Sequence, residues 1–138
     1  MIFFVQVGGD ASGEVLNSSQ IRRPATGAAS ITIYSLIKHK TIDLMKFWIG
    51  FFENESCGQC TPCREGVYRL LKIINSSDPD WKLFSEVLNA LDETAFCGLG
   101  CAVSVPLRSY TKNVLAKMQN KDIKISSTEN KMICECFK

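Results

Sequence analysis

Histidine, long apolar runs and an excess of charge of one sign are all scarce in this sequence of 138 residues. The single histidine, His39, lies between two lysines, which favours a solvated loop over a ligand or a catalytic base. The longest dense apolar stretch, Leu44 to Phe52, is interrupted by Lys46 and is too short to cross a bilayer. The 16 basic and 14 acidic residues leave a net charge of +2, which gives no electrostatic case for nucleic acid. We therefore expect neither membrane insertion nor nucleic-acid binding.

Cysteine, in contrast, is abundant, with seven residues in the chain. The first ten residues, MIFFVQVGGD, are not expected to form a signal peptide, because no basic residue precedes the apolar run and no small-residue cleavage pattern follows it. A cytoplasmic, reducing location is the expectation, and there a dense cysteine pattern favours metal binding or redox chemistry over disulfides. The odd number would also leave one thiol unpaired in a pure disulfide framework.

The pattern of apolar residues changes near residue 40. Strands are predicted at Phe3–Val7 and Ile31–Leu36, with a loop between them that contains Gly13, Pro24 and Gly27. From Thr41 onward the apolar residues recur at helical spacing. The predicted fold is mainly α, a four-helix bundle preceded by a small partial β segment, and the expected divisions are a β segment at 1–40, a helical domain at 41–121 and a tail at 122–138.

Start signals place the four predicted helices. The first carries a wide apolar face that includes Phe47. The second should be capped by Thr61, with Pro62 at its first position, and Asp78-Pro79 repeats this signal for the third. Phe96–Gly100 interrupts the pattern before a fourth helix that starts around residues 104–106 and reaches Met118. A short strand is predicted in the tail, around residues 123–125.

The most informative stretch is ESCGQCTPCREG, in which Cys57, Cys60 and Cys63 follow one another at a constant spacing of three. Structural zinc usually takes one pair of ligands from each of two turns. Three thiols on one loop with a remote fourth are the usual form of a [4Fe–4S] site, whose separate irons each need one thiolate. Zinc remains the alternative, and would make the chain a zinc-stabilised helical protein-interaction module.

The fourth ligand has to come from the later cysteines. Cys97 is favoured because it lies one helical hairpin beyond Cys63, beside two glycines that let backbone approach a bulky cofactor. Cys101 is the nearest rival, and is otherwise expected to be a small buried thiol. Cys134 and Cys136 are expected to be free thiols in the tail. Within the second helix, the first turn favours a Cys63 thiolate, and Arg64 is placed to add positive charge.

ESCGQCTPCREG, with FFEN before it and FCGLG and VPLRSY after it, resembles the C-terminal iron–sulfur domain of the NADH-binding flavoprotein subunit of respiratory complex I. The same module occurs in NAD-linked hydrogenases and formate dehydrogenases. Residues 4–36 resemble the later part of the β-grasp domain that precedes it. The resemblance implies Cys57, Cys60, Cys63 and Cys97 as ligands of one [4Fe–4S] cluster, which takes electrons from reduced flavin and passes them along a chain of clusters.

The resemblance does not extend to the flavin and NADH site, which in that family lies in a preceding glycine-rich domain. The segment from Gly8 to Gly13 has a Walker A interval, but Glu14-Val15 replaces the required Lys and Ser or Thr, so it is interpreted as a turn. FMN and NAD are therefore expected on another domain or chain, and this chain is not expected to be catalytic alone. The implied partners are a flavin/NADH-binding domain or subunit and other iron–sulfur subunits of a complex, peripheral to a membrane.

Overall fold

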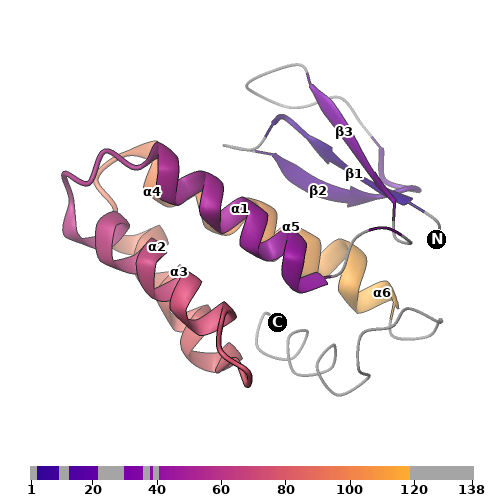
Figure 1. Cartoon of the computed structure of the whole chain (residues 1–138). Coiled ribbons are helices and arrows are strands. Elements are labelled where there is room, and N and C mark those ends of the chain that lie inside the picture. Colours follow the sequence, from indigo (N-terminus) through magenta and orange to yellow (C-terminus); the bar gives the residue numbers. More distant parts are fainter. Residues whose placement is uncertain (1–2, 10–12, 22–29, 36–37, 39–40, 119–138) are drawn as a thin grey trace.

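A computed structural model describes residues 3–9, 13–21, 30–35, 38 and 41–118. The predictions for His39, for the tail strand around residues 123–125 and for Cys134 and Cys136 lie outside the described residues. In the described part, a small sheet precedes a mainly helical remainder, as predicted (Figure 1). No helix in that part is long and apolar enough to cross a membrane.

Three antiparallel strands form the sheet in the order β2-β1-β3. They are β1 (Phe3–Val7), β2 (Glu14–Asn17) and β3 (Ile31–Ser35). Phe4 of β1 pairs with Asn17 on one side and with Tyr34 on the other. The prediction of a loop throughout the segment between β1 and β3 was wrong, because β2 forms there and adds the third strand that a stable sheet requires.

Helices make up most of the chain after residue 40. They are α1 (Thr41–Glu55), α2 (Thr61–Ile74), α3 (Trp81–Thr94), α4 (Gly98–Ala102), α5 (Ser104–Tyr110), a π-helical turn η1 (Thr111–Leu115) and α6 (Ala116–Met118). The predicted interruption before residue 104 is confirmed, although a short helix, α4, forms within it. Figure 1 shows the sheet at one end of α1, and α4 with the α1–α2 connection at the other end.

The helix starts differ from the predicted caps by one or two residues. Cys60, rather than Thr61, is the N-cap of α2, and it has extended backbone with no side-chain cap bond. For α3 the N-cap is Asp80 rather than Asp78, since the Asp80 carboxylate accepts a hydrogen bond from the Leu83 N–H at 3.0 Å. The predicted start at Asp78 was therefore two residues early, because it is the Asp80 carboxylate that reaches a free N–H group of the first turn.

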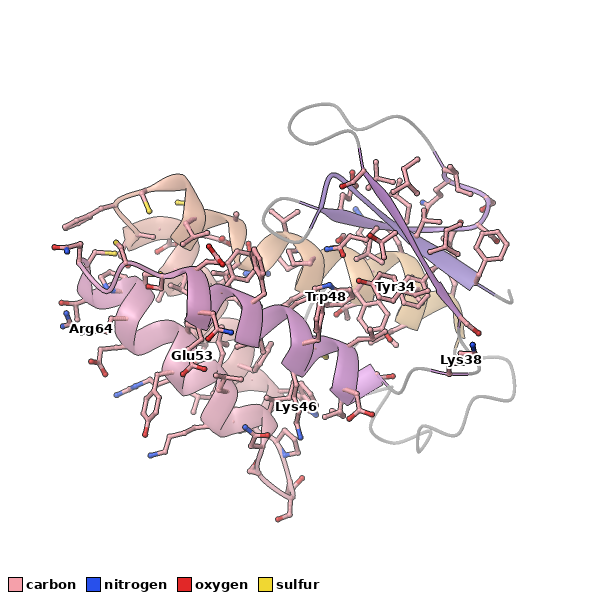
Figure 2. All side chains as sticks on the ribbon, turned by 45° about the horizontal axis from the view of Figure 1, so that its top comes forward. Tyr34, Lys38, Lys46, Trp48, Glu53 and Arg64 are labelled. Atoms are coloured by element: carbon pink, nitrogen blue, oxygen red, sulfur yellow. The ribbon has the colours of Figure 1, made fainter. Side chains whose placement is uncertain are left out.

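One hydrophobic core joins the inner face of the sheet to the helices. Its centre is aromatic: the rings of Phe4 and Tyr34 stack with centroids 5.2 Å apart, and Trp48 meets Tyr110 edge to face at 5.2 Å. Figure 2 shows Tyr34 and Trp48 side by side between sheet and helix. Phe47, predicted on the apolar face of α1, is instead 52% exposed. The sheet is thus anchored to the bundle by packing of large rings.

Buried polar groups cross the same interface. The side-chain carbonyl oxygen of Gln6 accepts hydrogen bonds from the Tyr34 hydroxyl and the Trp48 indole N–H, both at 3.2 Å. On β2, the Val15 N–H donates to the Ser109 hydroxyl and the Val15 carbonyl accepts from the Asn113 amide, both at 2.8 Å. The outer edge of β2 therefore pairs with helical side chains, which satisfies backbone groups that an edge strand leaves open.

Candidate metal centre

The connection from α1 to α2 is a tight turn built around Ser56 and Gly58. The Ser56 N–H donates to the Phe52 carbonyl at 2.9 Å, so the turn starts directly from the end of α1. Gly58 has φ of +69°, a left-handed conformation that favours glycine. Its N–H donates to the Ser56 hydroxyl oxygen at 3.3 Å, and its carbonyl accepts from the Arg64 guanidinium at 3.0 Å. These bonds fix the path of the chain between Cys57 and the start of α2.

The cysteines of this turn differ in exposure. Cys60 and Cys63 are buried, with 6% and 4% of their surfaces exposed, whereas Cys57 is exposed. Cys60 is the N-cap of α2 and Cys63 lies in the first turn of that helix, as predicted. Arg64, which follows, lies at the end of the bundle away from the sheet (Figure 2). Two thiols thus face inward at a helix start, and a third reaches solvent.

Cys97 is the N-cap of α4, as Cys60 is the N-cap of α2, and it is exposed. The pKa of the Cys60 thiol is lowered, and the backbone N–H of Phe96, the residue before Cys97, is the main cause. The N–H groups of Cys63 and Cys60 and the charge of Arg64 act in the same direction, against burial. The arrangement favours thiolate, the form that binds metal.

Gly100 brings α4 against α2. A Cβ atom on Gly100 would lie 2.5 Å from the Cβ of Ala95 and 3.6 Å from the Cβ of Cys63, so a side chain there would clash with Ala95. Gly98 has no such constraint, since nothing lies within 4 Å of its Cβ position. Both glycines were expected to let the backbone approach a cofactor closely. In the structure only Gly100 of these two has close neighbours, and they are atoms of Ala95 and Cys63.

Cys101, the rival for the fourth ligand position, points elsewhere. Its sulfur lies 4.0 Å from the Asp92 carbonyl oxygen and 3.9 Å from that of Ala95, at the C-terminal end of α3. The prediction that it is buried was wrong, because Cys101 is exposed. Its sulfur is thus near the carbonyls that end α3.

A cavity of about 380 Å³ opens beside Cys63, lined in part by Ser56, Gly58, Arg64 and Tyr68. The Ser56 hydroxyl lies 3.2 Å from the Cys63 sulfur. In the described ranges, no group of three or more His, Cys, Asp or Glu side chains is placed to hold a single metal ion. Sequence reasoning named Arg64 but missed Ser56 and the Phe96 N–H, because neither carries a periodicity or spacing signal.

A helical bundle with three cysteines on one turn, and a fourth at the start of a helix that packs on that turn, has the donor set of an iron–sulfur protein. Residues 43–121, more than half of the chain, match the family described as the NADH-ubiquinone oxidoreductase-F iron-sulfur binding region. The chain belongs to this family.

Individual relatives agree with this assignment. One subunit of the NADH-quinone oxidoreductase of Streptomyces coelicolor is 32% identical over 71 residues, which cover 47% of this chain and 16% of the relative. The HndC subunit of the NADP-reducing hydrogenase of Solidesulfovibrio fructosivorans is 32% identical over 74 residues, which cover 49% of this chain and 15% of that protein. This chain therefore spans only a small part of the length of the curated relatives it matches.

A solved structure shares the fold over nearly the whole chain. In an NAD⁺-reducing [NiFe]-hydrogenase in the H₂-reduced state, one chain superposes with a TM-score of 0.68 at 21% identity. The match covers 91% of this chain and 24% of the hydrogenase chain. The likeness therefore includes the sheet as well as the helices, beyond the region that the family description covers.

Proposed function

We propose that this chain is an electron-transfer module that holds one [4Fe–4S] cluster through Cys57, Cys60, Cys63 and Cys97. The observation that carries the proposal is the approach of α4, which Cys97 caps, to the first turn of α2, where the Cβ position at Gly100 lies 3.6 Å from the Cβ of Cys63. That approach puts the helix that starts at Cys97 next to a buried thiol of the other loop. Because the Cys101 sulfur lies near the carbonyls that end α3, Cys97 is the better candidate for the remote ligand.

The residues present suit such a cluster. Thiolates are its usual protein ligands, and N–H groups directed at sulfur stabilise their negative charge. When bound, the cluster takes up and releases single electrons. The chain itself contributes the four thiolates, the N–H groups at the start of α2, the charge of Arg64 and a buried side formed by Cys60 and Cys63. These groups bind the cluster and set how readily it is reduced.

The wider role is proposed from the named relatives, which are subunits of NADH-quinone oxidoreductase and of an NADP-reducing hydrogenase. In such an assembly this module would accept electrons from a flavin and NADH site on another domain or subunit, and pass them to further iron–sulfur subunits. FMN and NAD would thus bind outside these residues, and the module alone would not oxidise NADH. The assembly is proposed to be cytoplasmic and peripheral to a membrane, and the chain to divide at 1–40, 41–121 and 122–138.

The test is metal analysis of anaerobically purified chain, with Cys97→Ser and Cys101→Ser as a matched pair. We expect about four irons and four sulfides per wild-type chain, the same in Cys101→Ser, and loss of the cluster in Cys97→Ser. Full iron in Cys97→Ser would refute the ligand set while leaving an iron–sulfur protein. One zinc per chain with no visible absorption would refute the cluster and favour the zinc-stabilised interaction module.

A further inference from the structure

Ser56 lies between the end of α1 and the first cysteine, and its hydroxyl contacts a proposed ligand. The distance from its oxygen to the Cys63 sulfur is 3.2 Å, within hydrogen-bond range for sulfur. The side chain is half-buried, and its backbone is fixed by the bond from the Ser56 N–H to the Phe52 carbonyl. The hydroxyl is therefore held in place by the helix end.

The neighbouring bonds determine which atom donates. The Gly58 N–H already donates to the Ser56 oxygen at 3.3 Å, which leaves the hydroxyl hydrogen of Ser56 to be directed elsewhere. A cysteine that binds metal does so as a thiolate, which has no hydrogen to give. The bond between Ser56 and a metal-bound Cys63 must then run from the serine hydroxyl to the sulfur.

We propose that Ser56 is a positioning residue that donates a hydrogen bond to the Cys63 sulfur and thereby raises the reduction potential of the bound cluster. The inference rests on the proposed function and adds a residue that acts on the cluster through its ligand. A hydrogen bond to an ionised acceptor is stronger than a neutral one. Because reduction adds negative charge to the cluster and its sulfurs, the bond stabilises the reduced state more than the oxidised state.

The geometry of the turn suits this role. Gly58 is left-handed, and this conformation is what returns its N–H to Ser56 and its carbonyl to Arg64. The cavity beside Cys63 is lined by the same residues, so solvent can reach the pair from that side. Without a serine hydroxyl, the sulfur would lose the side-chain donor that lies 3.2 Å from it.

The experiment compares Ser56→Thr with Ser56→Val in the anaerobically purified chain. These two side chains have nearly the same shape and differ in the hydroxyl, and Ser56→Ala is the third variant. Ser76→Ala is the matched control, because Ser76 lies beyond the far end of α2 and donates to the Ile73 carbonyl. The measurement is the midpoint potential of the cluster, from a redox titration followed by electron paramagnetic resonance, with iron content determined on each sample.

We expect the potential of Ser56→Val and Ser56→Ala to shift to more negative values, and that of Ser56→Thr and Ser76→Ala to stay at the wild-type value. A purely structural role would change iron content without a shift that depends on the hydroxyl. Equal potentials in Thr and Val variants that carry full clusters would overturn the role of Ser56 alone. A wild-type chain that binds no iron would overturn the proposed function, and the role of Ser56 toward a cluster with it.

Discussion

The two ends of α1 differ in what surrounds them. At the sheet end, large rings pack together, and amide groups such as those of Gln6 and Asn113 are buried with their hydrogen-bond partners. At the cysteine end, the described residues carry two buried and three exposed thiols, and the shape of the loops depends on Gly58 and Gly100. The described part of the sheet end is held by packed rings and buried amides, whereas the cysteine end is organised around sulfur atoms.

This difference teaches where stability and function reside. Aromatic packing and satisfied amides resist change over the whole interface, so substitutions there should lower the free energy of unfolding. Turns and N-caps position a few atoms, so substitutions there should act first on metal retention. Substitutions at each end therefore test whether the two properties can be changed separately.

The largest effect is expected for Gln6→Ala. This change removes the acceptor shared by the Tyr34 hydroxyl and the Trp48 N–H, and it opens a cavity in the core. The free energy of unfolding should fall by about 3 kcal/mol, measured by denaturant titration of the cluster-free chain. Gln20→Ala, at a partly exposed site after β2, removes longer bonds to the Asn17 N–H at 3.3 Å and to the Asn113 amide oxygen at 3.5 Å, and should cost about 1 kcal/mol. Iron content should stay full in both, and loss of iron in Gln6→Ala would contradict the separation.

A smaller effect is expected at Gly100. Alanine there would place its Cβ 2.5 Å from that of Ala95, the C-cap of α3, which forces α4 away from the end of α3 and shifts the loop that carries Cys97. We expect a loss of about 2 kcal/mol in unfolding free energy, together with reduced iron per chain. Gly98→Ala is the matched control, since the space around Gly98 is open, and it should change stability by less than about 0.5 kcal/mol. Equal iron content in the two variants would show that the packing of α4 does not position Cys97.

The smallest effect distinguishes Gly58 from Gly50. Alanine at Gly58 must adopt φ of +69°, which costs about 1 kcal/mol although there is room for the methyl group. Alanine at Gly50, inside α1 and equally unobstructed, should instead stabilise by up to about 1 kcal/mol. Thermal unfolding with iron analysis checks both. A stabilising Gly58→Ala would mean that the turn does not require its left-handed glycine.

Much of the helical part could be predicted from sequence, because its signals are local. The apolar stripes predicted the helices, and the interruption at Phe96–Gly100 was visible as a break in the helical spacing. β2 was missed for the opposite reason: it has four residues, and two of its edge bonds come from Ser109 and Asn113, more than 90 positions away. A segment held by partners so distant in sequence has little local pattern to identify it.

In the candidate site, too, the features with a local sequence signal could be predicted and those set by distant contacts could not. The spacing of Cys57, Cys60 and Cys63 predicted their grouping on one turn, and the position of Cys63 in the first turn of α2 was confirmed. The surroundings of these thiols could not be predicted, because the Ser56 hydroxyl and the Phe96 N–H reach sulfur only through the folded path of two loops. The ligand set itself stays a prediction.

The number of residues in the π-helical turn η1 determines how the end of this helix is oriented. A wide turn contains one more residue than a regular turn, so the helix after Leu115 is rotated by about 100° from the continuation of α5. Asn113, inside that turn, accepts a hydrogen bond at its carbonyl from the Asn17 amide while its own amide binds Val15. Deleting Thr111 or Lys112 would remove the extra residue before Asn113 and rotate Asn113 by about 100° away from β2. One extra residue in the helix is therefore what lets Asn113 hydrogen-bond to the strand.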